Sequence, residues 1–222
     1  MNNRETDTNE NEAGLENVTK GRYPVHCLTV IGQIEGHFES GSQIKTTKYE
    51  HVIPQLVSVQ EDPQIKALMV ILNTVGGDVE AGLAIAELIK SITKPTATVV
   101  LGGGHSIGIP IAVSGDRSFI VPTATMTVHP VRHSGTVMAT TQTENYLKSI
   151  QKRVTDFVTQ NSGISRQRFE ELMMQSDMLL MDTGTSLDGT QAVKEGIIDG
   201  IGCISDAFSY VYSEIEKRET DG

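Results

Sequence analysis

Three short apolar segments, rich in β-branched residues and bounded by Gly, Asn or Pro, constrain the fold more than any other feature of the sequence. They span Cys27–Ile34, Ala67–Leu72 and Ala97–Leu101. Continuous apolar runs of this length are typical of strands buried on both faces. Segments with apolar residues at helical spacing separate them, at about Thr46–Gln60 and Val79–Ile92. The order strand, helix, strand, helix, strand predicts an α/β fold with a largely parallel sheet.

Capping and breaker residues refine these helices. Asp78 and Ser165 each precede a helical pattern in the position of an N-cap, and Pro54 predicts that the first helix begins near it or kinks. The apolar stripe expected on that first helix consists of Val52, Ile53, Leu56 and Val57. The further elements expected are a helix from Ser106 to Ala112, strands at Ser118–Val121 and Met126–Val128, a long helix at about Met138–Gln160 and a last helix at about Asp206–Arg218.

Length and composition predict one domain, over residues 23–218, behind a disordered acidic tail at residues 1–22. The net charge of −10, with scattered Lys and Arg, argues against a nucleic-acid partner. No apolar run reaches 18 residues, so membrane insertion is not expected. No Cys/His metal spacing occurs, and we expect neither a metal nor a cofactor. Two cysteines and no secretory signal pattern indicate a reducing, cytoplasmic location.

Two glycine-rich turns follow consecutive predicted strands and lead into helices. They are Asn73–Gly77 and Gly102–Gly108. In open α/β sheets, sites form beyond the carboxyl ends of strands, and free N–H groups at helix starts can stabilise a developing oxyanion. Neither turn matches GxxxxGK[ST] or GxGxxG, which argues against nucleotide binding. Two tight turns without a ligand remain an alternative.

Ser106 lies in a G-x-S-x-G pattern between a predicted strand and a helix, the setting of a raised nucleophile. A serine there can equally be a helix N-cap. As a nucleophile it needs a base, and His129 is the candidate because it directly follows a predicted strand; His133 in the next loop is a solvated alternative. No histidine follows His133, which excludes the α/β-hydrolase order of serine, acid, then histidine.

Taken together, these segments resemble the Clp protease proteolytic subunit, ClpP, of the crotonase-like fold group, from about residue 28 to 200. Asn73–Gly77 with Ala81–Ile85 is similar to the family's N-S-P-G-G and A-G-L-A-I, and Gly104–Gly108 stands where the family has A-A-S-M-G. Met126–Pro130 is similar to M-I-H-Q-P, and Ala192–Asp199 is similar to A-V-E-Y-G-L-I-D.

The resemblance implies a fold of repeated β-β-α units with a protruding handle helix at about residues 138–160. It implies a serine peptidase with Ser106 as nucleophile and His129 as general base. The oxyanion N–H groups would come from Gly76, Gly77 and Ile107. The implied substrate is a peptide or unfolded protein, and the implied assembly is a homo-oligomer of one or two heptameric rings enclosing the active sites.

Two departures from the family pattern stand out. A gap-free count places Gly184 where the family has its triad acid; the nearby acids are Asp177, Asp182 and Asp188, and Asp182 is the choice after a small loop shift. An acidic tail replaces the family's axial N-terminal segment, so the sequence assigns no ATPase partner. These features are most similar to the ClpP-like branch called translocation-enhancing proteins. A weakly active or inactive ring scaffold or adaptor and, less favoured, a crotonase-type acyl-CoA enzyme are the alternatives.

Overall fold

A parallel sheet forms the body of the protein, whose computed structural model describes residues 17–38, 40–41, 43–132, 140–175 and 183–221. Neighbouring strands in its main path are all parallel, as the alternation of strands and helices predicted. In spatial order these strands are β2 (Thr46–Lys48), β1 (Val25–Glu35), β3 (Ala67–Gly77), β4 (Thr96–Gly104), β5 (Arg117–Ile120) and β8 (Gly200–Ile201).

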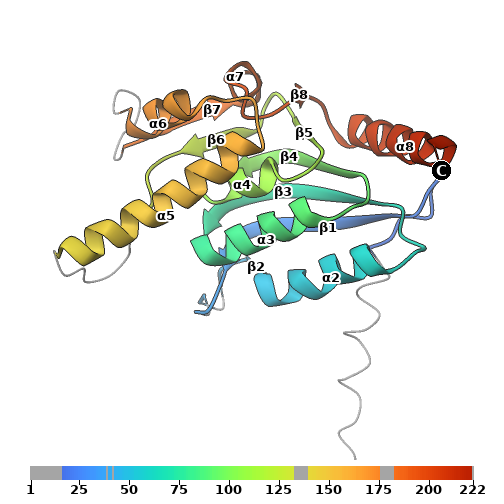
Figure 1. Ribbon diagram of the computed structural model, residues 1–222, viewed down its shortest axis with the longest axis horizontal. Helices are drawn as coiled ribbons and strands as arrows, with labels where there is room; N and C mark the ends of the chain where they lie inside the picture. The colour runs from blue at the N-terminus through green and yellow to red at the C-terminus, as the bar shows by residue number, and fades with distance from the viewer. Residues whose placement is uncertain (1–16, 39, 42, 133–139, 176–182, 222) are drawn as a thin grey trace, which may run out of the picture.

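Two further strands branch from the end of β4. Strand β6 (Thr125–Val128) pairs in parallel with β4 through Gly103 and Thr125. Strand β7 (Thr185–Asp188) then pairs antiparallel with β6 along its whole length. This small β6–β7 ribbon lies beside the carboxyl end of the main sheet (Figure 1). Strands β2, β7 and β8 were not predicted.

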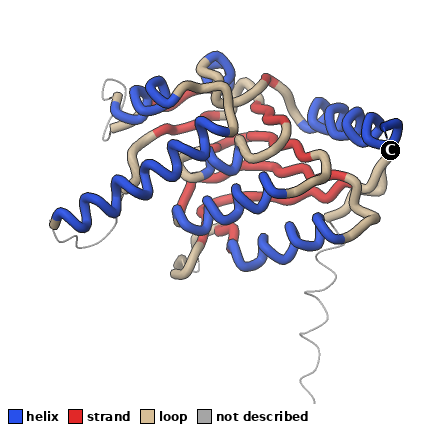
Figure 2. The backbone as a smooth tube through the Cα atoms, in the orientation of Figure 1, coloured by secondary structure: helices blue, strands red, loops and turns tan. Residues whose placement is uncertain are grey.

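Helices pack on both faces of the sheet, and those of the nearer face lie in front of the strands in Figure 2. Helices α2 (Tyr49–Glu61), α3 (Val79–Ser91) and α4 (Gly108–Ala112) share one hydrophobic cluster with α5 (Thr141–Gln160) and α6 (Arg166–Met174). Helix α8 (Ile204–Asp221) packs on the opposite face in a second cluster, and α7 (Gly189–Lys194) follows β7. None of the helices within the described ranges is long and apolar enough to cross a bilayer.

Helix α5 extends beyond the sheet at its N-terminal end (Figure 1). Its buried residues lie between its midpoint and its C-terminal end, and they are Ile150, Val154, Thr155, Phe157 and Val158. The helix begins at Thr141, after Thr140 caps it by accepting a hydrogen bond from Thr143 N. The predicted start at Met138 lies outside the described residues. An arm with one solvated end is the protruding handle that was expected.

The prediction for the first helix is wrong at its start. Residues 46–48 form β2 instead, because they pair in register with residues 33–35 of β1. Pro54 lies inside α2 rather than at its beginning. Val57, expected in the buried stripe, is 51% exposed, whereas Val59 is buried.

Part of the predicted N-terminal tail contacts the sheet. Asn17 O accepts a hydrogen bond from Cys27 N (2.9 Å), and Thr19 N donates to Val25 O (2.9 Å). The boundary expected at residue 22 therefore falls within a segment that is bound to β1. Residues 1–16 of the predicted tail lie outside the described part of the chain.

Candidate active site

Ser106 lies on a strained turn between β4 and α4. Its φ of 55° makes it the only non-glycine residue with positive φ in the described ranges. Two neighbouring strands hold the turn: His105 N donates to Thr74 O (3.2 Å), and Ser106 N donates to Thr127 O (2.9 Å). Residue Ile107, not Ser106, is the N-cap of α4, so the alternative that Ser106 caps this helix is wrong. A strained turn that raises a serine is the geometry of a nucleophile elbow.

The first glycine turn packs directly against this serine. At Gly76, with φ of 90°, an added Cβ would lie 2.7 Å from Ser106 Cβ, so only glycine fits. Gly76 N donates to Thr74 Oγ1 (3.0 Å), which itself donates to Gly32 O (2.6 Å). Gly77 lies one residue further along and lines the same cavity as Ser106. The structure thus brings together the two glycine turns that the sequence singled out.

An unpaired backbone N–H lies next to the serine. Ile107 is only 2% exposed, and its N–H makes no hydrogen bond with any residue in the described part of the chain. Its neighbours Gly108 N and Ile109 N both donate, to His105 O (2.9 Å) and Ser106 O (3.0 Å). Buried N–H groups are almost always paired, so an unpaired one beside a strained serine indicates a site for an acceptor from outside the chain.

His129 directly follows β6, and a backbone carbonyl orients its ring. Its Nδ1 lies 2.7 Å from Pro130 O. Since a carbonyl oxygen can only accept, Nδ1 must carry the proton, which leaves Nε2 of the neutral ring as an acceptor. No carboxylate within the described residues forms a hydrogen bond or ion pair with His129.

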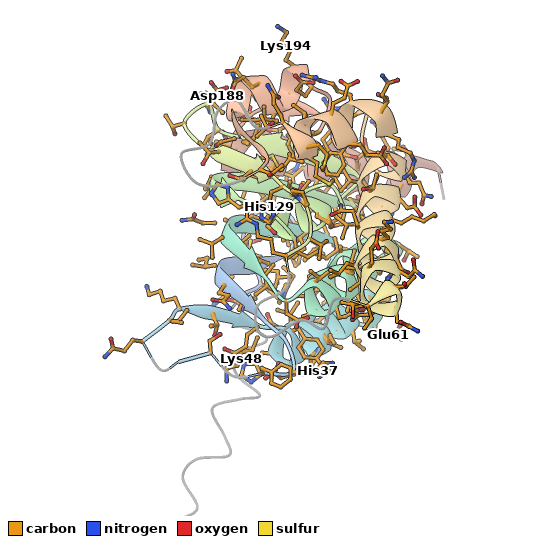
Figure 3. The ribbon with its side chains drawn as sticks, turned by 90° about the vertical axis from the view of Figure 1, so that its left-hand side faces the viewer. His37, Lys48, Glu61, His129, Asp188 and Lys194 are labelled. Carbon is orange, nitrogen blue, oxygen red and sulfur yellow. The ribbon has the colours of Figure 1, made fainter. Side chains whose placement is uncertain are left out.

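One cavity of about 420 Å³ contains both candidate catalytic residues. Ser106 and His129 are each half-buried in its wall. No hydrogen bond joins their side chains in this structure. The remaining lining is mainly apolar and consists of Gly77, Val79, Ile107, Ile109, Val128, Val131, Arg132, Gln151, Val154, Phe169 and Met173. Figure 3 views this edge of the molecule, with His129 near its middle.

Gly184 lies against His129, which agrees with the gap-free count in the sequence. The β6–β7 pairing ends at Val128 opposite Thr185, and an added Cβ at Gly184 would lie 2.5 Å from Val128 O and 2.8 Å from His129 Cβ. With φ of 135° as well, this position cannot carry a side chain without a change in the backbone. The place where the resemblance put an acid is therefore filled by the Val128 carbonyl and by Cα and Cβ of His129.

The candidate acids are not at this place. Asp188 pairs with Thr125 at the far end of the β6–β7 ribbon and caps α7, accepting from Gln191 N (2.8 Å). Figure 3 shows Asp188 well apart from His129. Asp182 and Asp177, together with the alternative base His133, lie outside the described residues.

Two polar residues near the site had no assigned role in the sequence. His105 Nδ1 forms a hydrogen bond with Thr127 Oγ1 (2.9 Å), and burial, with a smaller contribution from His129, lowers the pKa of His105. Gln151 Oε1 accepts from Val131 N (2.7 Å). A signal for Gln151 was present, because a polar residue three positions before Val154 lies on the buried side of α5.

No group of three or more His, Cys, Asp or Glu side chains within the described ranges could hold a metal ion. The site so far is a strained serine, a histidine with a free Nε2 and an unpaired N–H in one cavity. These parts correspond to a nucleophile, a base and an oxyanion donor.

Comparisons with known proteins agree with this geometry. The family model for Clp protease matches residues 26–204, so the chain belongs to the Clp protease family. The "Translocation-enhancing protein TepA" of Halalkalibacterium halodurans is 55% identical over 195 residues, covering 88% of this chain and 76% of that protein. The "ATP-dependent Clp protease proteolytic subunit 1" of Chlamydia muridarum is 28% identical over 140 residues, covering 60% of this chain and 69% of that protein.

A solved structure supports the fold. A point mutant of ClpP1 from Listeria monocytogenes superimposes with a TM-score of 0.65 over 82% of this chain and 93% of that chain, at 20% identity. The predicted ClpP-like fold and the predicted resemblance to the family, including its translocation-enhancing branch, are therefore confirmed.

Proposed function

We propose that this chain is a serine peptidase that cleaves peptides or unfolded proteins. Ser106 Oγ attacks the substrate carbonyl, and His129 Nε2 accepts the hydroxyl proton. The Ile107 N–H stabilises the oxyanion of the tetrahedral intermediate, together with an N–H from the Gly76–Gly77 turn. His129 then donates its proton to the leaving amine, and water hydrolyses the acyl-enzyme by the reverse sequence.

The unpaired N–H of Ile107 next to a serine with φ of 55° is the observation that carries this proposal. An oxyanion site requires a donor beside the nucleophile that no group in the described part of the chain already engages. The hydrogen bond from His129 Nδ1 to Pro130 O adds to it, because it leaves Nε2 free for the serine proton. The missing contact between Ser106 and His129 fits a site without substrate, since such bonds often form only on binding.

The second oxyanion donor is best assigned to Gly77. Gly76 N is engaged by Thr74 Oγ1, while Asp78 N donates to Ile34 O of β1 (2.9 Å). Successive N–H groups of a strand point to opposite sides, so the Gly77 N–H faces away from β1, toward β4 and Ser106. Gly76 would donate only after releasing Thr74. Asp182 remains the sequence-based candidate for a third catalytic residue.

The assembly proposed is a homo-oligomer, with one or two heptameric rings that enclose the active sites. Membership of the Clp protease family and the projecting end of α5 support it. A cytoplasmic location is proposed from the cysteine usage, and no ATPase partner is assigned. Size-exclusion chromatography with light scattering would measure the number of 24.1 kDa subunits.

A fluorophosphonate probe tests the nucleophile. Wild type should be labelled at Ser106, and Ser106→Ala should lose both labelling and peptide hydrolysis. The control is Ser209→Ala, an exposed serine on α8 that should change neither. Labelling that persists in Ser106→Ala, or a folded, assembled wild type that resists the probe and cleaves no peptide, would refute the peptidase.

A non-catalytic scaffold or adaptor is the second candidate, and Gly184 at the place of the acid favours it. The similarity to a protein named translocation-enhancing rather than protease agrees with this alternative. It predicts that Ser106→Ala supports the biological phenotype as well as wild type does. A null phenotype for Ser106→Ala, with normal assembly, would exclude it.

A further inference from the structure

The segment that follows the base is held from outside the sheet. His129 Nδ1 donates to Pro130 O (2.7 Å), so the ring orientation depends on where that carbonyl points. The N–H of the same peptide unit, Val131 N, donates to Gln151 Oε1 (2.7 Å) on α5. One backbone peptide, Pro130–Val131, therefore binds the imidazole on one side and the Gln151 amide on the other.

The orientation of the Gln151 amide follows from its partner. Val131 N can only donate, so the atom facing it must be Oε1. Gln151 Nε2 is buried and has no hydrogen-bond partner within the described residues. Burial of this unpaired donor opposes folding, while the Oε1 atom of the same amide satisfies Val131 N.

Helix α5 gives this contact a rigid base. Ile150 and Val154, on either side of Gln151 in the sequence, are buried in the main core. Arg153 forms a two-point ion pair with Glu80 in the first turn of α3 (2.6 and 2.9 Å). The amide of Gln151 is therefore fixed relative to the sheet, and the Pro130 carbonyl is fixed through it.

We propose that Gln151 is a positioning residue for the catalytic base. Through Val131 it aims the Pro130 carbonyl, which holds the His129 ring in the tautomer that presents Nε2 to Ser106. This backbone carbonyl performs the orienting role that a carboxylate has in a complete triad, at a site where Gly184 excludes a side chain. The inference rests on the proposed peptidase for its kinetic consequences, but not for the ring orientation itself.

Hydrolysis of a fluorogenic peptide by the assembled full chain tests the kinetic part. Gln151→Leu should lower kcat about 100-fold while KM changes less than about threefold, because the base is displaced and the binding surface is kept. Gln151→Glu retains an acceptor for Val131 N and should stay within about tenfold of wild type.

The control is Gln142→Leu, an exposed glutamine in the first turn of the same helix, which should match wild type. A Gln151→Leu variant with kcat within about threefold of wild type would overturn the inference. The inference would also be overturned if Gln151→Glu lost as much activity as Gln151→Leu. It would be overturned too if Asp182→Asn abolished hydrolysis while Gln151→Leu remained active.

¹⁵N-histidine NMR gives a second readout that does not require activity. Wild-type His129 should be protonated at Nδ1 and unprotonated at Nε2, and Gln151→Leu should mix the two tautomers. Unchanged His129 signals in Gln151→Leu would overturn the positioning role even if the enzyme is active. Conversely, the expected NMR change in a protein that neither hydrolyses peptides nor labels at Ser106 would retain the inference and reject the proposed function.

Discussion

Restoring an acid at position 184 should damage the site rather than complete a triad. Comparison with the family pattern alone would predict that Gly184→Asp gains activity, because the acid is missing at that place. The structure predicts the opposite. The φ of 135° and the contact of an added Cβ with Val128 O at 2.5 Å mean that any side chain forces the backbone to move.

The size of the effect follows from the overlap. An added Cβ lies 2.8 Å from His129 Cβ and 3.1 Å from its Cα, whereas ordinary contacts begin near 3.4 Å. His129 must therefore move by about 0.6 Å if it absorbs the overlap, and a misplacement of about 1 Å costs about 100-fold in rate. The strained backbone adds about 1–3 kcal/mol of destabilisation.

The assay compares Gly184→Ala and Gly184→Asp with wild type for kcat/KM on one fluorogenic peptide, and for the free energy of unfolding in urea. Both variants should lose at least about tenfold in kcat/KM and about 1–3 kcal/mol in stability. Gly200→Ala is the matched control, because its added Cβ meets only Arg117 Nη2 at 3.8 Å. A Gly184→Asp variant more active than wild type would refute the reasoning.

Two further predictions concern stability. Asp188→Ala removes the side-chain acceptor of the capping box with Gln191 and should lower the free energy of unfolding by about 1 kcal/mol in urea titrations; an unchanged value would mean the box is not stabilising. Burial lowers the pKa of His26 below its ordinary value of 6.5, with Gln55 offsetting part of the shift. Between the lowered pKa in the folded protein and the ordinary pKa in the unfolded chain, the unfolded chain binds more protons than the folded protein. The free energy of unfolding should therefore rise with pH up to about 6.5 and fall on acidification. His26→Leu should flatten this dependence, and an equally steep profile in the variant would contradict the assignment.

Strong local patterns made much of the fold predictable. The runs that became β1, β3 and β4 are apolar throughout because both faces of the sheet are covered, and Asp78 and Ser165 cap α3 and α6 as expected. Short elements had no such signal. Residues 46–48 form a strand only because β1 offers an unpaired edge, which no pattern within three residues can reveal. The conformation of that segment is determined by its tertiary contacts and not by the intrinsic propensity of its residues.

The candidate site, like the fold, could be predicted only in part from the sequence. Ser106 was found from its G-x-S-x-G pattern between a strand and a helix, and His129 because it directly follows a strand; such strand ends meet at one edge of a sheet. Counting back along the chain placed Gly184 at the position of the family's acid, but only the structure reveals its close contact with Val128 O and His129. The Pro130 carbonyl could not be predicted at all, because every residue has a carbonyl and only its direction distinguishes it.

The hydrogen bond from Ser106 N to Thr127 O fixes the position of the candidate nucleophile relative to strand β6. Thr127 is thereby fixed next to the nucleophile turn, and His129 follows two residues later, directly after the end of β6. Side chains alternate faces at every residue, so inserting or deleting one residue here would turn the imidazole to the other side of the strand. A relative with one residue more or fewer between the positions of Thr127 and His129 should therefore be unable to use the same serine and histidine together.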